Sequence, residues 1–237
     1  MHSRGKVAAS VLATMLLSCT TGPELRDPRA RVAATRLVAL PAQGQIFVVG
    51  PRGRKISDAV LSRVVLENVN DSINYLLHQH GGRSFGSAAT ARLEHFTEFY
   101  HWSWDAMNEI MAERLGNEPA LHRSVAEWRF PHDIASWRPV LNAEFVLVSF
   151  ILYADPGQGL NGPSVDLERS MTPDALSLTG AGSRAIACVV AVDSGHMVWC
   201  NFIPNNSVRM QERSAAQSAV EVLLGDMLKL ADGAPRT

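Results

Sequence analysis

One stretch of the chain places carboxylates and an imidazole at helical spacing. Glu98 and His101 form a Glu-x-x-His pair. Glu94 and Asp105 lie about one helical turn to either side, so the four residues could share one helix face. Such a face can bind a metal ion or supply general acid–base groups. A di-metal carboxylate site would need a second Glu-x-x-His on a facing helix, and the sequence has none. A solvated face with helical ion pairs is therefore favoured, and no metal site is predicted.

Two cysteines flank a predicted hairpin turn. The apolar runs 185–192 and 196–203 are joined by Asp-Ser-Gly, residues 193–195, with glycine at the left-handed position. A three-residue loop would place Val192 opposite His196 and, counting outward, Cys188 opposite Cys200. Opposed Cβ atoms are about 4.5–5.5 Å apart, which a disulfide can close with modest adjustment. The pair is a disulfide or, if the register differs by one residue, two small buried hydrophobic side chains.

The third cysteine follows a segment with the layout of an export signal. A basic start precedes the apolar residues 7–17 and the small Ser18. This apolar segment is too short to span a bilayer as a stable helix. Residues 16–19, Leu-Leu-Ser-Cys, resemble the lipobox of bacterial lipoproteins, in which the cysteine receives a diacylglycerol and the chain is cut before it. An ordinary secreted protein is the alternative.

The lipobox resemblance implies a location. Residues 1–18 would be removed as a signal peptide, and Cys19 would carry the lipid at the new amino terminus. By the same resemblance Thr20, in place of an aspartate, implies the outer membrane of a Gram-negative bacterium, with the protein facing the periplasm. Several acyl chains, at about 0.8 kcal/mol per buried CH₂, would make this membrane attachment effectively permanent. Residues 19–35 would form a tether without periodic structure.

Charge and composition limit the remaining function classes. The 22 basic residues include Arg4 and Lys6, so the chain after the cut has 20 basic against 23 acidic residues and a formal charge of −3. The arginines are scattered and no basic run is interleaved with aromatic residues, so a nucleic-acid partner is not expected. No later segment reaches the length of about 20 apolar residues that a membrane helix needs. Residues 36–237 are predicted to form one domain.

The periodicity of apolar residues predicts the elements of this domain. Residues 37–40 and 46–49 form two strands or one strand with a bulge. A helix capped by Ser57 ends at the glycines 81–82. A short strand at 83–85 precedes a second helix over 88–115, with Leu93, Phe96, Tyr100, Trp104, Met107 and Met111 on its apolar face. A central strand at 145–153, the hairpin and a helix over 214–231 complete the order.

Two segments carry a resemblance to a known group. "AEFVLVSFILYAD" and, after a long loop, "AIACVVAVDSGHMVWCNF" resemble bacterial exported lipoproteins, with related domains in the curli secretion lipoprotein CsgG and the amino-terminal domain of TolB. The resemblance covers about residues 143–230. It implies an α/β fold with one mixed sheet of about five strands, a C-terminal hairpin and about three flanking helices, used for binding or assembly. The loop 154–184 lacks long alternating apolar stretches, so the pore-forming hairpins of CsgG have no counterpart.

Candidate binding residues lie in that loop and on the second helix. Residues 157–162 match G-x-G-x-x-G, but no periodic helix follows, so no dinucleotide or other cofactor is predicted. Gly157, Gly159 and Leu160 are candidate partner contacts, together with Trp102 if its aromatic stripe is exposed and not part of the core.

The favoured function is a non-enzymatic lipoprotein of the cell envelope that binds a protein partner or forms a homo-oligomer. The sequence has no H-E-x-x-H zinc motif. An envelope hydrolase or metal-dependent enzyme that uses Glu98, His101 and Asp105 is the alternative.

Overall fold

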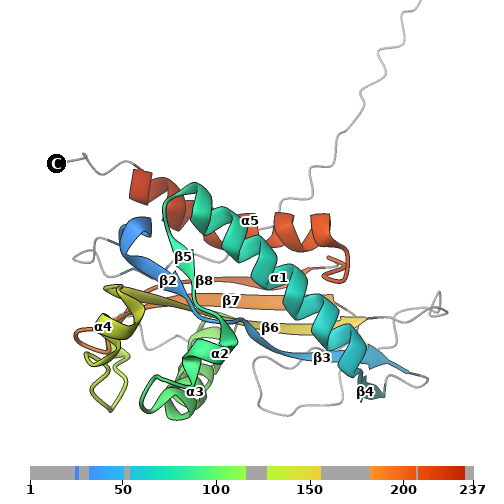
Figure 1. Cartoon of the computed structure of the whole chain (residues 1–237). Coiled ribbons are helices and arrows are strands. Elements are labelled where there is room, and N and C mark those ends of the chain that lie inside the picture. The colour runs from blue at the N-terminus through green and yellow to red at the C-terminus, as the bar shows by residue number, and fades with distance from the viewer. Residues whose placement is uncertain are drawn as a thin grey trace, which may run out of the picture.

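The computed structural model describes residues 25–26, 32–50, 54–115, 127–155, 182–206 and 208–232. They form a mixed sheet with helices on both faces (Figure 1), which confirms the predicted α/β class. Cys19, Gly157, Gly159 and Leu160 lie outside the described residues, as do residues 156–181 of the predicted loop.

Three long antiparallel strands form the centre of the sheet. They are β6 (Phe145–Asp155), β7 (Gly182–Ala191) and β8 (Met197–Asn206), in the order β8-β7-β6. Nine consecutive residues of β6, from Val146 to Ala154, are buried, because helices cover both of its faces. The central strand and the hairpin are therefore confirmed, and β7 and β8 together extend further than 185–203.

Shorter strands extend the sheet on both sides. β2 (Leu37–Ala39) and β3 (Gln43–Val49) both pair with β6 in parallel. β5 (Arg83–Ser84) continues the sheet beyond β2, and β4 (Lys55–Ser57) continues it beyond β3. β1 (Leu25–Arg26) pairs with β8, so part of the predicted tether belongs to the sheet. The described sheet has eight strands instead of about five, because these additional strands have only two or three residues.

β2 and β3 act as one strand with a bulge, which was one of the two sequence interpretations. Leu37 pairs with Phe145 and Gln43 with Phe150, so the offset falls from 108 to 107 between them. One extra residue therefore lies between the two strands, at residues 40–42. The Ala42 amide donates to Asn70 Oδ1 over 2.8 Å, and the Pro41 carbonyl accepts from Tyr100. A helix on each face thus satisfies a backbone group that the bulge releases.

The helix α1 (Ala59–Gln79) begins one residue later than its predicted cap implies. Asp58, and not Ser57, is the N-cap: its Oδ1 accepts from the Leu61 amide over 2.8 Å, whereas Ser57 belongs to β4. The helix ends as predicted at Gly81, whose φ of 78° is left-handed. The Gly82 amide then donates to Leu77 O over 2.8 Å, which closes the last turn.

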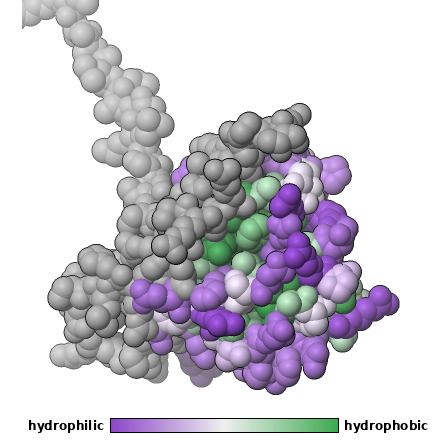
Figure 2. Space-filling model, turned by 90° about the vertical axis from the view of Figure 1, so that its left-hand side faces the viewer, coloured by the Kyte–Doolittle hydropathy of each residue, from purple (hydrophilic) through white to green (hydrophobic). Residues whose placement is uncertain are grey.

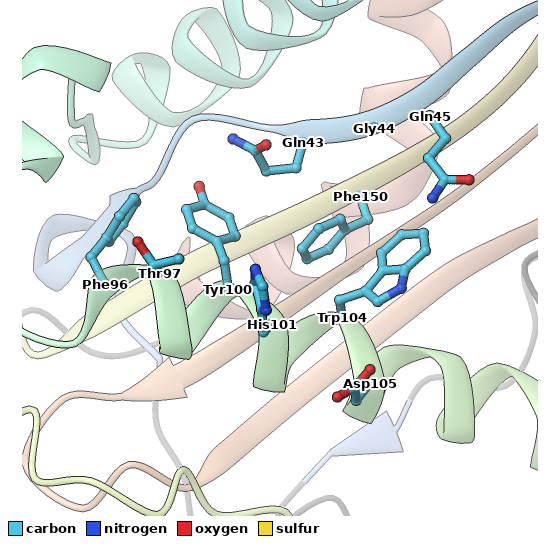
Figure 3. A pocket seen from close by; sticks show the side chains of 10 residues that line it. All are labelled: Gln43, Gly44, Gln45, Phe96, Thr97, Tyr100, His101, Trp104, Asp105 and Phe150. Atoms are coloured by element: carbon cyan, nitrogen blue, oxygen red, sulfur yellow. The ribbon is translucent and has the colours of Figure 1, made fainter. Parts of the chain in front are cut away.

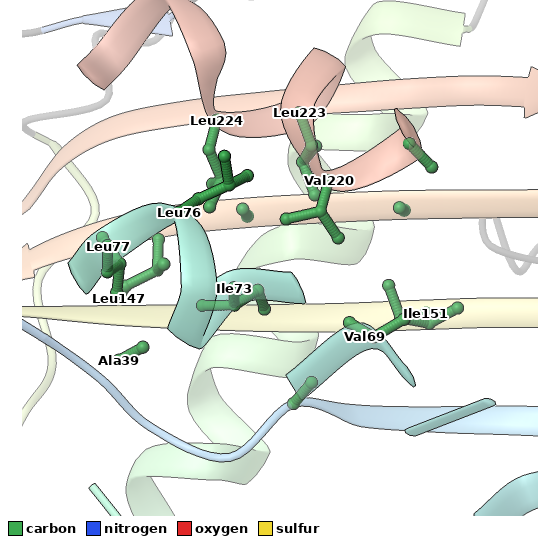
Figure 4. Close-up of a cluster of buried hydrophobic side chains, with 14 of the residues drawn as sticks. Ala39, Val69, Ile73, Leu76, Leu77, Leu147, Ile151, Val220, Leu223 and Leu224 are labelled. Atoms are coloured by element: carbon green, nitrogen blue, oxygen red, sulfur yellow. The ribbon is translucent and has the colours of Figure 1, made fainter. Parts of the chain in front are cut away.

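One face of the sheet is covered by two long helices, α1 and α5 (Arg213–Asp232), which pack against each other. Aliphatic side chains from both helices meet those of β2 and β6 (Figure 4). Val69, Ile73, Leu77, Val220 and Leu223 are all at most 2% exposed. This face is therefore a closed hydrophobic layer.

The other face is covered by α3 (Phe96–Leu115), with the short helices α2 (Ser87–Thr90) and α4 (Trp137–Leu141) nearby (Figure 1). The predicted single helix over 88–115 is wrong, because residues 91–95 form a turn. His95 there has a φ of 56°, which a helix cannot contain. Trp137 Nε1 donates to the Glu94 carbonyl over 2.8 Å and so occupies a group that a continuous helix would use internally.

The hairpin turn differs from its prediction, although the cysteine register does not. The Ala191 amide donates to His196 O over 2.9 Å, so Ala191 and not Val192 faces His196, and the loop has four residues. The ladder then shifts by one: Val190 pairs with Met197, and Val189 with Trp199, which leaves Val198 as a bulge. The bulge compensates for the longer loop.

Cys188 consequently lies opposite Cys200, as the sequence predicts. The two sulfur atoms are bonded at 2.08 Å, and the Cα atoms are 4.1 Å apart. Both residues are at most 1% exposed, so the disulfide belongs to the core beneath α3.

The surface at one end of the molecule is mostly hydrophilic where its residues are described, with smaller hydrophobic areas between (Figure 2). Among the helices of the described residues, none is both long and apolar enough to cross a membrane.

Candidate functional site

A groove of about 550 Å³ lies between α3 and the strands β3 and β6 (Figure 3). Its residues are six from α3, three from β3 and one from β6: Phe96, Thr97, Tyr100, His101, Trp104, Asp105, Gln43, Gly44, Gln45 and Phe150. Among the described residues, α3 is the one helix that lines it.

Four aromatic side chains form the apolar part of the groove. Phe96 and Tyr100 meet edge to face with ring centroids 4.6 Å apart. Tyr100 and Phe150 are 5.9 Å apart, and Phe150 and Trp104 are 5.0 Å apart. Phe96 and Trp104 are half-buried, so the two ends of this aromatic row remain accessible. Exposed aromatic rings of this kind are typical of binding surfaces.

Polar groups border the aromatic row. Gln43 and Gln45 are exposed on β3, and His101 and Asp105 are exposed on α3. Each amide can both donate and accept hydrogen bonds. Gln43 and Gln45 share one side of the strand because alternate residues point to the same face.

Gly44 sets the close approach of β3 to β6. A Cβ atom at this position would lie 2.5 Å from the Ile151 carbonyl oxygen. A larger residue would therefore push β3 away from β6 and deform the groove.

Tyr100 connects the groove to the strand bulge. Its hydroxyl donates to the Pro41 carbonyl, and the ring is 9% exposed. Burial raises the pKa of Tyr100 well above its usual value, and a hydrogen bond with the Gln43 side chain offsets this only partly. Tyr100 is therefore a neutral hydrogen-bond donor that fixes β2 and β3 against α3.

The four residues that were predicted to share one helix face do not all lie together. His101 and Asp105 line the groove, whereas Glu98 contacts His95 and His132. Glu94 precedes the helix, in the 91–95 turn. Of the three residues of the alternative enzyme site, His101 and Asp105 therefore border the groove, and Glu98 does not. Glu98 is separated along the helix axis, because it lies in the first turn of α3, about 10 Å from Asp105 at 1.5 Å per residue, and contacts His95 in the preceding turn.

Glu98 forms a cluster with two histidines that sequence spacing did not connect. Its Oε2 lies 2.8 Å from His95 Nδ1 and 3.2 Å from His132 Nε2. The two imidazole rings stack with centroids 4.4 Å apart and planes 9° apart. Two imidazoles and one carboxylate are a ligand set for a transition metal. His95 is adjacent to the Glu-x-x-His motif, but no local pattern predicts that His132 would join it.

Trp102 lies outside the groove, and its role as a partner contact stays a prediction. It is half-buried and packs on Phe99 and Phe130, with centroids 5.7 and 5.4 Å apart. Between residues 96 and 110 of α3, where burial is described, the buried residues are Phe99, Tyr100, Ser103, Ala106, Met107 and Ile110. The buried stripe is therefore rotated from the predicted one, and Trp104 is half-buried at the groove instead of in the core.

Comparisons with known proteins identify no family. No family model matches the chain, and neither does any curated protein. Two solved PelC dodecamers from Paraburkholderia phytofirmans are 10% identical, with TM-scores of 0.35. One, a variant, is matched over 87% of this chain and 98% of its own, and the other over 86% and 95%. The lipoprotein GNA1162 from Neisseria meningitidis is 12% identical over 81% of this chain and 97% of its own, with a TM-score of 0.32.

TM-scores this low do not identify a shared fold, so the function is argued from the residues alone. The resemblance to CsgG and to the amino-terminal domain of TolB stays a prediction.

Proposed function

We propose that this protein is an exported lipoprotein, anchored by Cys19 to the outer membrane and facing the periplasm, whose domain binds a protein partner without catalysing a reaction. The lipobox-like residues 16–19 support the anchor. The Cys188–Cys200 disulfide supports an oxidising compartment, because such bonds are rare in the cytosol and common after export.

The groove between α3 and β3 is the proposed binding surface. The observation that carries this proposal is the aromatic row from Phe96 to Trp104, accessible at both ends and bordered by polar side chains. Tyrosine and tryptophan contribute a large share of binding energy at protein interfaces, because they bury much area at little entropic cost. Hydrolysis would instead need a nucleophile or water activated by a nearby base.

The chemistry of the groove favours an extended peptide segment of the partner. The aromatic row would take apolar side chains, and the Gln43 and Gln45 amides would pair with peptide groups. β3 pairs with β6 over residues 43–48 and with β4 only over residues 47–49, so at residues 43–46 the other edge of β3 pairs with no strand among the described residues and could also accept the peptide backbone. The partner is a second envelope protein, or a second copy of this chain.

A photo-crosslinking amino acid at position 104 in intact cells tests this proposal. We expect a specific crosslinked product in the membrane fraction. Tyr75 on α1 is the matched control, because it is a 53% exposed aromatic residue on the opposite face of the sheet. A crosslinker at position 75 should give no such product.

The anchor is tested in the same cells with Cys19→Ala. We expect loss of labelled palmitate, and loss of the position-104 product from the membrane fraction. A position-104 product that is absent, or no stronger than that at position 75, would overturn the binding proposal. Palmitate uptake by the Cys19→Ala variant would overturn the anchor.

A further inference from the structure

The cluster of His95, Glu98 and His132 has the geometry of a metal-binding site. The ligand atoms of all three residues lie within 4.8 Å of one another. Zinc binds imidazole nitrogen and carboxylate oxygen at about 2.0–2.2 Å, so tetrahedral ligands lie about 3.3 Å apart. The 2.8 and 3.2 Å contacts around Glu98 Oε2 are already close to this separation.

We propose that His95 Nδ1, His132 Nε2 and Glu98 Oε2 bind one Zn²⁺ ion, with the fourth position open to water. This goes beyond the proposed binding function, since the cluster is separate from the groove. The cluster is accessible to an entering ion, because the side chains of His95, Glu98 and His132 are 35%, 57% and 44% exposed.

The other ring nitrogen of His95 also faces a carboxylate. Its Nε2 lies 3.7 Å from Glu94 Oε1. A carboxylate behind a ligating histidine sets its tautomer and raises its basicity, which strengthens metal binding. Glu94 is therefore positioned as a supporting residue for His95.

Tertiary contacts hold the three ligands in position. The turn that carries His95 is held by the 2.8 Å hydrogen bond from Trp137 Nε1 to the Glu94 carbonyl. The segment that carries His132 is held by Phe130, which is 1% exposed and packs edge to face on Phe99. Both segments therefore rest on the aromatic core, and binding requires one imidazole to turn out of the stack so that both nitrogens face the same ion.

A metal ion explains this arrangement better than hydrogen bonds alone. Partly exposed ion pairs usually contribute little to stability. Here, however, two imidazoles from distant segments direct nitrogen atoms at one carboxylate oxygen. Zn²⁺ would crosslink the segment before α4 to the start of α3 and would stabilise the folded chain in proportion to its occupancy.

Calorimetric titration of Zn²⁺ into the full chain, purified in detergent without a polyhistidine tag and stripped with chelator, tests the proposal. We expect one ion per chain. His132→Ala and Glu98→Gln should weaken binding by at least the 10- to 100-fold that follows loss of a supporting residue. His101→Ala is the matched control, since it removes an exposed histidine of the same helix that lines the groove, and it should bind as the unmodified protein does.

Cobalt provides a readout that needs no variant. The unmodified protein with Co²⁺ should show the visible absorption of a four-coordinate site, and Zn²⁺ should abolish it. Absence of one-to-one Zn²⁺ binding, unchanged affinity in His132→Ala, or equal loss in His101→Ala would each overturn the proposal. Loss of partner crosslinking at position 104 would leave the zinc result unaffected, so the two proposals can fail separately.

Discussion

The two faces of the sheet are built differently. Over one face α1 and α5 form an aliphatic layer in which Val69, Ile73 and Leu223 are fully buried (Figure 4). Over the other face α3 is the one long helix among the described residues, and it lies on an aromatic core around Phe99 and Phe130 with the short helices α2 and α4 and irregular chain nearby. The first face has the packing of a structural core, whereas the second leaves an open groove and a histidine cluster at its edges.

This difference indicates which face serves stability and which serves binding. Two long helices side by side cover the sheet, so the side chains between them and the strands are buried; the cavity of about 610 Å³ on this side lies between α1 and α5, and its lining includes Leu76, Glu221 and Asp226. A single helix cannot cover the same width, and its flanking residues remain half-exposed. Trp104 and Glu98 occupy such positions, on different sides of α3.

The largest expected effect comes from truncating the aliphatic layer. Leu77→Ala removes a fully buried side chain of α1, and we expect the free energy of unfolding to fall by about 2–5 kcal/mol. Urea denaturation measures this change in the free energy of unfolding. Val60→Ala, at a 63% exposed position of the same helix, should change stability by less than about 0.5 kcal/mol. Equal losses in the two variants would contradict the assignment of this face as the structural core.

A smaller effect is expected where the aromatic face meets the bulge. Tyr100→Phe leaves the Pro41 carbonyl without its donor, and we expect a loss of about 1–3 kcal/mol in the free energy of unfolding. Tyr75→Phe removes an exposed hydroxyl and should be nearly neutral. If both variants were equally stable, Tyr100 would not hold the bulge.

The smallest expected effect is a change in how the free energy of unfolding depends on pH, and it comes from Tyr153 on the aliphatic face. Burial, and secondarily the charge of Asp155, raises the pKa of Tyr153 to about 12. An unfolded tyrosine loses its proton near pH 10, so between about pH 10 and 12 the folded state holds a proton that the unfolded state has lost. Stability therefore falls as pH rises through this window.

Tyr153→Phe should reduce the loss of stability with rising pH, as measured by urea denaturation at pH 9, 10 and 11. The slope with pH is the readout, because the variant also loses the hydrogen bond from Tyr153 to Gln211 and so differs in absolute stability. A slope as steep as that of the unmodified protein would show that Tyr153 does not contribute to the alkaline loss.

Much of the fold could be predicted because the signals are local. Apolar periodicity placed α1, α5 and the three long strands, and the left-handed Gly81 marked the end of α1. The 91–95 turn could not be predicted in this way, because its residues continue a helical pattern. A side chain from Trp137, distant in sequence, interrupts the helix there.

The pairing of Cys188 with Cys200 was predicted correctly, but the predicted loop length was wrong. The loop has one residue more than expected, and the bulge at Val198 restores the pairing of Cys188 with Cys200. Bulges depend on packing against the rest of the sheet, which spacing within a hairpin does not reveal.

The sequence by itself determined the order of the long elements, the apolar runs of the central strands, and the export-signal pattern that ends at Cys19, because these depend on residues close together in the chain. Only the tertiary structure decided that Glu98 lies with His95 and His132, whereas His101 and Asp105 line the groove. The helix phase of α3 is set by which residues pack on the sheet, and His132 arrives on a segment positioned by Phe130. Contacts between distant segments follow from packing the whole core, and no local pattern encodes them.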